Sequence, residues 1–148
     1  MDINNRIREQ VKTDLAAAML NDDGTSLIKT FHNGVPFFLE VADPSDAYAE
    51  GDIPALSVSL SDGTPVSDDF SENTWQATMT VRLYQQASNL IEQSLDELGQ
   101  VVIETLGTHY DANGLLETCN RSGFDYGRDD EQPWGTLDLY FSVQYTEE

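Results

Sequence analysis

The chain of 148 residues carries 27 Asp and Glu against 7 Lys and Arg, which leaves a formal net charge of −20. This charge disfavours duplex nucleic acid and anionic membrane surfaces as direct partners, because both attract cationic side chains. The length suits one domain, so we predict a single domain over residues 1–148. Six Phe, six Tyr and two Trp provide large side chains for its hydrophobic core.

The chain also lacks the sequence signals of export. No apolar stretch approaches the roughly 20 residues that a membrane-spanning helix needs. The amino terminus has no uninterrupted apolar core of the kind found in secretory signals. Cys119 is the only cysteine, so no intrachain disulfide can form and no cysteine cluster can bind zinc. These features predict an intracellular, reducing setting.

The amino-terminal segment has the spacing of an amphipathic helix. Apolar side chains recur at every fourth position on a polar background, at Ile3, Ile7, Val11, Leu15 and Met19. The sequence NDDG at residues 21–24 then ends the pattern, because Asn, Asp and Gly favour turns. We predict one helix whose apolar stripe packs on a sheet or on another protomer.

A β-hairpin is predicted after this helix. Two short apolar runs, residues 26–31 and 35–41, flank His32, Asn33 and Gly34. An Asn-Gly pair suits a tight hairpin turn, since both residues tolerate positive φ.

Two further strands and an acidic connector follow. Residues 53–60 alternate apolar side chains with serines, and residues 75–83 alternate apolar with polar side chains. Both patterns predict strands with one buried face. The stretch between them, residues 61–73 (SDGTPVSDDFSEN), is rich in acids and turn residues and is predicted to be a mobile loop. Trp75 and Trp134 each begin a predicted strand, so we expect both to anchor the core.

The carboxyl-terminal half completes an α+β fold. Apolar residues at helical spacing predict a second helix over 88–107, with Ser88 as its N-terminal cap. After a loop around residues 111–114, a short predicted strand leads to residues 123–126, and an alternating strand over 136–145 follows. We therefore predict a largely antiparallel or mixed sheet of about five strands, with the helices packed on one face.

No catalytic motif stands out in the sequence. It contains no glycine-rich phosphate loop, no H-E-x-x-H pattern and no Gly-x-Ser-x-Gly turn. His32 is placed in a hairpin turn and His109 after a helix end, so neither is predicted to act as a base. Asp129, Asp130 and Glu131 could bind a hard cation, but their spacing is weak support for a site. We predict a chain that is not an enzyme and needs no cofactor.

Three segments of the sequence, in their order and spacing, carry a resemblance to a known family. They are residues 52–60 (DIPALSVSL), residues 74–77 (TWQA) and residues 123–130 (GFDYGRDD), the last followed by Trp134 and by Asp138-Leu139. The sequence resembles the tail terminators of long-tailed phages, of the minor tail protein U type. The third segment is the most specific part of this resemblance.

This resemblance implies a structural role in a phage or prophage. Members of the family form a hexameric ring on the end of the tail tube, which stops tube polymerisation and provides the surface for head-tail joining. The implied partners are further copies of the chain, the tail tube protein and the head-tail connector proteins. The implied location is the virion tail, after assembly in the cytoplasm of the bacterial host.

The few basic residues are candidates for contacts between protomers, because copies of so acidic a chain repel one another. Arg82, Arg121 and Arg128 are the only basic residues after Lys29, and each could bridge to a carboxylate of a neighbour. An ordinary intrachain salt bridge explains each of them equally well. We place Arg128 with Asp129 and Asp130 in a turn between two strands, as an assembly contact.

Acidic residues form the second set of candidate contacts. Asp68, Asp69 and Glu72 of the predicted loop suit a basic partner surface. A divalent cation such as magnesium could also aid ring assembly by relieving the repulsion between carboxylates.

Two other functions remain open from the residues alone. An acidic DNA-mimic inhibitor would carry carboxylates along an extended face, whereas here they concentrate in predicted loops. A metal-dependent hydrolase could use Asp129 and Asp130, but the supporting His and Gly features are missing.

Overall fold

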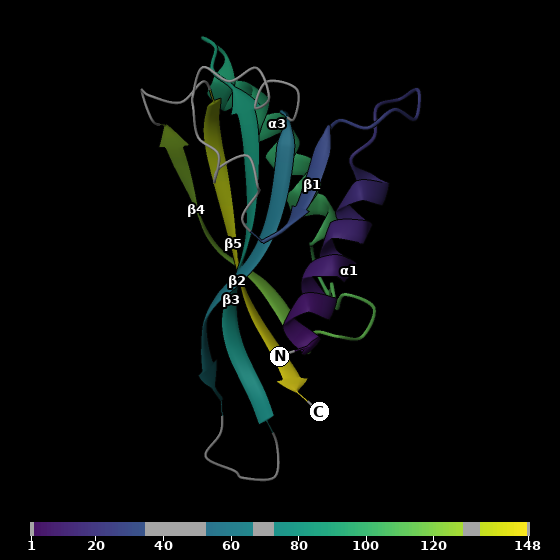
Figure 1. Ribbon diagram of the computed structural model, residues 1–148, viewed down its shortest axis with the longest axis vertical. Helices are drawn as coiled ribbons and strands as arrows, with labels where there is room; N and C mark the ends of the chain where they lie inside the picture. The colour runs from purple at the N-terminus through teal and green to yellow at the C-terminus, as the bar shows by residue number, and fades with distance from the viewer. Residues whose placement is uncertain (1, 35–52, 67–72, 129–133, 148) are drawn as a thin grey trace.

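The computed structural model describes residues 2–34, 53–66, 73–128 and 134–147 (Figure 1). Within these residues it contains two helices and one five-stranded sheet. The elements, in chain order, are α1 (Asp2–Ala18), β1 (Thr30–Asn33), β2 (Ala55–Pro65), β3 (Asn73–Gln86), α3 (Ile91–Thr105), β4 (Thr118–Arg128) and β5 (Trp134–Glu147). No helix in the described part of the chain is long and apolar enough to span a membrane.

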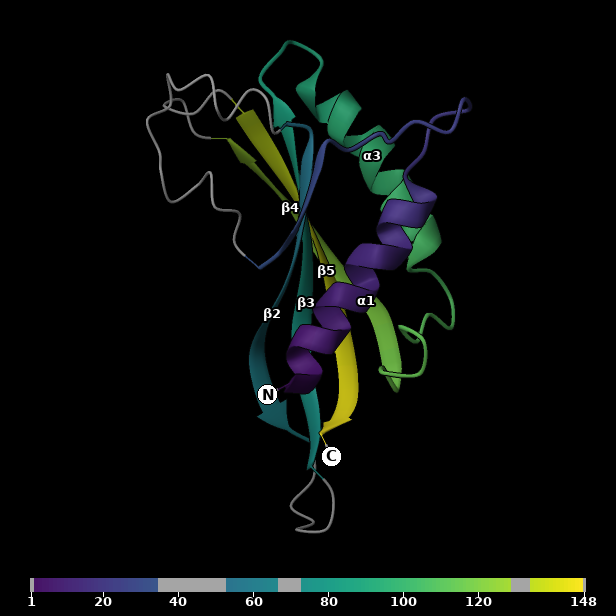
Figure 2. The same ribbon diagram turned by 45° about the vertical axis from the view of Figure 1, so that its right-hand side comes forward.

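The sheet is mixed and open. Its strand order is β1-β2-β3-β5-β4, in which β1 pairs with β2 in parallel and the other neighbours pair antiparallel. Both helices lie on the same face of the sheet (Figure 2). α1 packs on β1 and β2, and α3 packs on β3 and β5. The predicted α+β fold, with a sheet of five strands and helices on one face, is confirmed.

The core lies between this face of the sheet and the helices. Side chains alternate between the two faces of a strand, so every second residue of β3 and β5 points to the helices. These inward residues are buried together with the apolar stripe of α1. The inward set from the two strands is Ala77, Met79, Val81, Leu83, Leu137, Leu139, Phe141, Val143 and Tyr145, and the buried stripe of α1 and the residue after it is Ile7, Val11, Leu15 and Met19.

Gly99 lets α3 approach the sheet closely. From the sequence alone, a glycine in the middle of a helix is expected only to weaken the helix slightly. In the structure Gly99 is buried, and a Cβ added there would lie 2.9 Å from Cδ2 of Leu137 on β5. A side chain at this position would force the end of the Leu137 side chain to move, and a branched one such as Val would crowd the core between α3 and the sheet further.

Replacing Gly99 with Val should lower the free energy of unfolding by about 1 to 3 kcal/mol, because overpacking a core forces side chains and backbone to shift. Gln100→Val is the matched control, since Gln100 is the exposed next residue of the same helix. Urea denaturation followed by circular dichroism measures both variants. Equal stabilities of the two variants would contradict the close approach.

The structure does not contain the hairpin turn that the sequence predicts at Asn33 and Gly34. Asn33 is the last residue of β1, which pairs in parallel with β2, and only Gly34 has a positive φ, of 84°. A two-residue hairpin turn needs positive φ at both central residues (type I′) or at the first of them (type II′), and Asn33 has neither arrangement. The Asn33 side chain instead bonds to α1, accepting from Arg8 at 2.5 Å and donating to Glu9 at 2.8 Å. The run 35–41 lies outside the described residues.

Part of the predicted loop of residues 61–73 is strand, namely residues 61–65 and Asn73. β2 continues to Pro65 and β3 begins at Asn73, so the two strands form a hairpin arm that projects past α1 (Figure 1). A register shift between Ser61 and Thr64, with Asp62 at a φ of 57°, adapts the pairing along the arm. The connector is thus shorter than predicted. Its acids at residues 68, 69 and 72 lie outside the described residues.

The second helix begins later than predicted. α3 starts at Ile91 with Leu90 in the capping position, so Ser88 is not the cap. The Ser88 hydroxyl accepts a hydrogen bond from the Leu90 N–H at 3.2 Å and so closes the turn that precedes the helix. A serine can stabilise such a turn as readily as a helix end, because both present a free backbone N–H.

Candidate assembly surfaces

Arg82 of β3 and Asp138 of β5 form a two-point ion pair on the face of the sheet opposite the helices. They stand directly across the two antiparallel strands. Arg82 donates from Nε to Oδ1 of Asp138 at 2.5 Å and from Nη2 to Oδ2 at 2.8 Å. Asp138 is 8% exposed. The hydrogen bond to Asp138 raises the pKa of Arg82 further above its usual value. Of the two alternatives for Arg82, the intrachain pair is therefore present, and a contact with a neighbour stays a prediction.

Arg82→Leu should lower the free energy of unfolding by about 1 to 2 kcal/mol. The variant leaves the shielded carboxylate of Asp138 uncompensated, but the Arg82 side chain is 42% exposed, so solvent screens part of the loss. The double variant Arg82→Leu with Asp138→Leu should be more stable than the single variant, since no charge is left unpaired. Guanidinium denaturation measures the free energy of unfolding of the wild type and of both variants. An unchanged stability of Arg82→Leu would show that the ion pair with Asp138 does not stabilise the fold.

The outer strand β4 presents a strip of aromatic and basic side chains on the helix side of the sheet. Phe124 stands opposite Leu139 and Tyr126 opposite Leu137. Residues paired in this way point to the same face, which is the face that the helices cover elsewhere. Phe124 is nevertheless 58% exposed and Tyr126 38% exposed. Their rings meet edge to face with centroids 5.7 Å apart, and the Tyr126 hydroxyl donates to Asp96 of α3.

Two arginines of β4 flank this aromatic pair, one before it and one after it. Arg121 and Arg128 are both exposed, and Arg128 is the last residue of β4. Among the described residues the ion pairs are Lys12 with Glu9 and Arg82 with Asp138, so neither strip arginine has a salt bridge there. We define the β4 strip as Arg121, Phe124, Tyr126 and Arg128. The predicted assembly residues Asp129 and Asp130 follow directly and lie outside the described residues.

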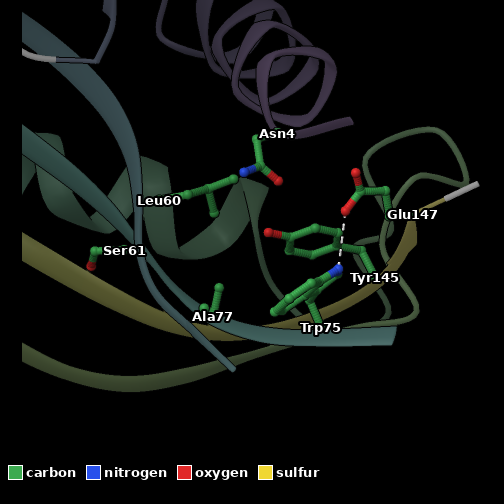
Figure 3. A pocket seen from close by; sticks show the side chains of 8 residues that line it. Asn4, Leu60, Ser61, Trp75, Ala77, Tyr145 and Glu147 are labelled. Atoms are coloured by element: carbon green, nitrogen blue, oxygen red, sulfur yellow. Dashed lines mark hydrogen bonds between the residues drawn. The ribbon is translucent and has the colours of Figure 1, made fainter. Parts of the chain in front are cut away.

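A pocket of about 260 Å³ lies at the amino-terminal end of α1 (Figure 3). α1 begins at this level, whereas the β2–β3 arm and β5 extend beyond it, so the helix does not cover this part of the sheet. The Trp75 indole forms one wall and donates to a Glu147 carboxylate oxygen at 3.1 Å. The pocket is lined by Asn4, Leu60, Ser61, Gly63, Trp75, Ala77, Tyr145 and Glu147. We call this the α1-end pocket. Trp75 is only half-buried, so it borders a cavity as well as the core.

The histidines and the cysteine do not form a reactive site in the described residues. His32 lies within β1, not in a turn, and its Nε2 is 2.8 Å from the Thr30 hydroxyl. His109 is exposed after α3 with a φ of 70°. Cys119 of β4 is half-buried, and burial raises its pKa to about 11, so the thiol is protonated at neutral pH.

A metal site is also absent from the described part of the chain. No group of three or more His, Cys, Asp or Glu side chains gathers there in a way that could hold an ion. The cluster of Asp129, Asp130 and Glu131 lies outside it, so magnesium binding there stays a prediction.

Acidic residues also lie outside the loops in which the sequence predicts that they concentrate. α3 contains no Lys or Arg, and four carboxylates occupy exposed positions of this helix. They are Glu92, Asp96, Glu97 and Glu104. The distribution of acidic residues therefore does not by itself distinguish a structural protein from an acidic mimic of DNA. The family to which the chain belongs distinguishes them.

The model of the family described as phage minor tail protein U matches residues 2–145. The chain belongs to the phage minor tail protein U family. The predicted resemblance is thereby confirmed over nearly the whole chain. This family member is a structural component of a phage tail, which agrees with the predicted non-enzymatic role and virion location.

Two relatives of the chain are each named tail tube terminator protein. The tail tube terminator protein of Escherichia phage N15 is 30% identical over 97 residues, which are 65% of this chain and 74% of the relative. The tail tube terminator protein of Escherichia phage lambda is 27% identical over 140 residues, which are 90% of this chain and 96% of the relative.

One solved structure shares the fold of this family member. It is a chain from the virion of a native gene transfer agent particle, with a TM-score of 0.51 and 11% sequence identity. The match covers 95% of this chain and 92% of that chain. At this identity the likeness concerns the fold alone.

Sequence reasoning missed part of the candidate surface. Phe124 and Tyr126 occupy alternating positions like those of any half-buried strand, and only the place of β4 at the sheet edge makes them exposed. The α1-end pocket combines residues from four elements, so no single motif could have indicated it.

Proposed function

We propose that this protein ends the phage tail tube as a hexameric ring. The ring stops polymerisation of the tube protein and then provides the surface to which the head-tail connector proteins join. The observation that carries this proposal is the lambda relative, a tail tube terminator protein aligned over 90% of this chain and 96% of its own length. Assembly takes place in the cytoplasm of the bacterial host, and the protein remains in the virion tail.

A closed ring follows from one contact repeated by rotation. Two different surfaces of each protomer must meet, and the rotation must close, because otherwise an open filament results. The net charge of −20 opposes this contact, so basic side chains at the seam, salt or a divalent cation such as magnesium must offset the repulsion. The tube end holds the copies close together and so raises their effective concentration.

The test is complementation of a phage that lacks this gene. Without the protein, tails should be overlong and should not carry heads, and the wild-type gene should restore both length and head joining. Electron microscopy of purified particles measures tail length and the fraction of tails with heads. Rings should also be visible at the tail end, and light scattering with and without millimolar magnesium gives the mass of the free protein. Normal tails in the absence of the gene would overturn the proposal.

The acidic connector of the β2–β3 arm is expected to contact a basic surface of the tube or of a neighbour. Neutralising Asp68, Asp69 and Glu72 together should weaken capping, because it removes the attraction to that basic surface. Added salt should weaken the wild-type interaction, because exposed charges are screened over about 8 to 10 Å. The control neutralises three exposed acids of α3, Glu92, Glu97 and Glu104. Tail length and head joining measure the effect, and equal behaviour of both triple variants would reduce this connector to a solvated turn.

A further inference from the structure

We propose that the ring seam is formed by the β4 strip of one protomer and the α1-end pocket of the next, with the Phe124 ring entering the pocket. The inference rests on the proposed ring, and it names the two surfaces that form it. Its starting point is that the helix-side face of the sheet stays open in two separate places, the strip along β4 and the pocket beyond the end of α1.

Size and polarity match between the two surfaces. Phe124 exposes 58% of its surface on an outer strand, although large aromatic side chains are stabilised by burial. The α1-end pocket of about 260 Å³ is walled by Leu60, Trp75 and Tyr145. A cavity of about 150 Å³ is sufficient to hold benzene, so the pocket can take a phenyl ring.

Charge is complementary as well. The strip carries Arg121 and Arg128, both exposed and without a salt bridge among the described residues. The pocket includes Glu147, and the exposed Asp62 lies in the sequence between Ser61 and Gly63, which both line the pocket. A chain with only 7 basic residues thus presents two of them beside its exposed aromatic pair, where a second copy can supply carboxylates.

The two surfaces cannot meet within one protomer. Within the sheet, the pocket residue Leu60 of β2 lies three strands from Phe124 of β4, about 14 Å. The pocket residue Tyr145 belongs to the neighbouring β5, but it lies six residues from Leu139, the partner of Phe124, which is about 20 Å along the strand. Two different and distant surfaces that fit each other produce a head-to-tail contact, which closes into a ring if the rotation allows it. Phe124 is therefore placed to fill the pocket of a second copy.

Cysteine cross-linking tests this contact directly. Phe124→Cys and Gly63→Cys are introduced together with Cys119→Ser, which removes the native thiol. Gly63 lines the pocket, has an ordinary φ and has no heavy atom within 4 Å of an added Cβ, so the substitution is not strained. Mild oxidation of purified tails should give a ladder of covalent oligomers on a non-reducing gel. Phe124→Cys paired with Gln93→Cys, an exposed position on α3, should give no ladder.

A second variant keeps the inference testable if the cysteine pair disturbs assembly. Phe124→Ala should weaken self-association on the order of tenfold or more, as for a buried aromatic residue at an interface, while its melting temperature stays normal. Capped tails with normal rings but no cross-link, together with unchanged association of Phe124→Ala, would overturn the seam and leave the ring intact. Absence of any ring on wild-type tails would instead overturn the proposed function.

Discussion

Replacing Trp134 with Ala is expected to lower the free energy of unfolding by about 3 to 5 kcal/mol, a large share of the stability of a small domain. Trp134 begins β5 and is 5% exposed. It packs with Ile53, Ala55 and Tyr84 in a second buried cluster. Tyr84 and Ala55 stand opposite each other on β3 and β2, on the face of the sheet away from the helices. The indole therefore closes a small core that no helix side chain can refill.

Trp75→Ala is the matched control for this result. Trp75 is half-buried beside the α1-end pocket, so its removal should cost less stability than the removal of Trp134. Denaturant unfolding monitored by circular dichroism compares the two variants without relying on tryptophan fluorescence. Equal losses would show that both residues anchor the core, as the sequence analysis predicts for them.

Arg128→Ala is expected to leave the melting temperature nearly unchanged and to produce overlong tails without heads. Arg128 is exposed at the end of β4 and has no salt bridge among the described residues. An exposed arginine contributes about 0 to 1 kcal/mol to stability. Loss of a seam contact to a carboxylate, in contrast, leaves an uncompensated charge at an interface, which is strongly unfavourable.

The matched control is Arg6→Ala, an exposed arginine of α1. Differential scanning calorimetry reports folding of both variants, and electron microscopy reports tail length and head joining. Normal tails, normal joining and normal stability of Arg128→Ala would refute an assembly role for this residue. The predicted assembly contact at Arg128, Asp129 and Asp130 would then be wrong.

Local patterns predicted the elements whose periodicity is long and regular. The four-residue repeat of α1 and the two-residue alternation of β3 and β5 identify a helix and two strands, since each pattern reports which side of the element is buried. The same reasoning failed at residues 61–65, where Ser, Asp, Gly and Pro indicate a loop. In the structure these residues extend β2 to Pro65, because pairing with β3 satisfies their backbone groups despite unfavourable composition.

The sequence by itself determined the fold class, the family and the face of each long element that is buried. Those properties follow from side-chain types at fixed local spacing. Only the tertiary structure decided that β1 runs parallel to β2, that Arg82 meets Asp138, and that β4 lies at the edge with Phe124 exposed. Such neighbours are distant in sequence, and strand order and register depend on the free energy of the whole packed sheet rather than on any local pattern.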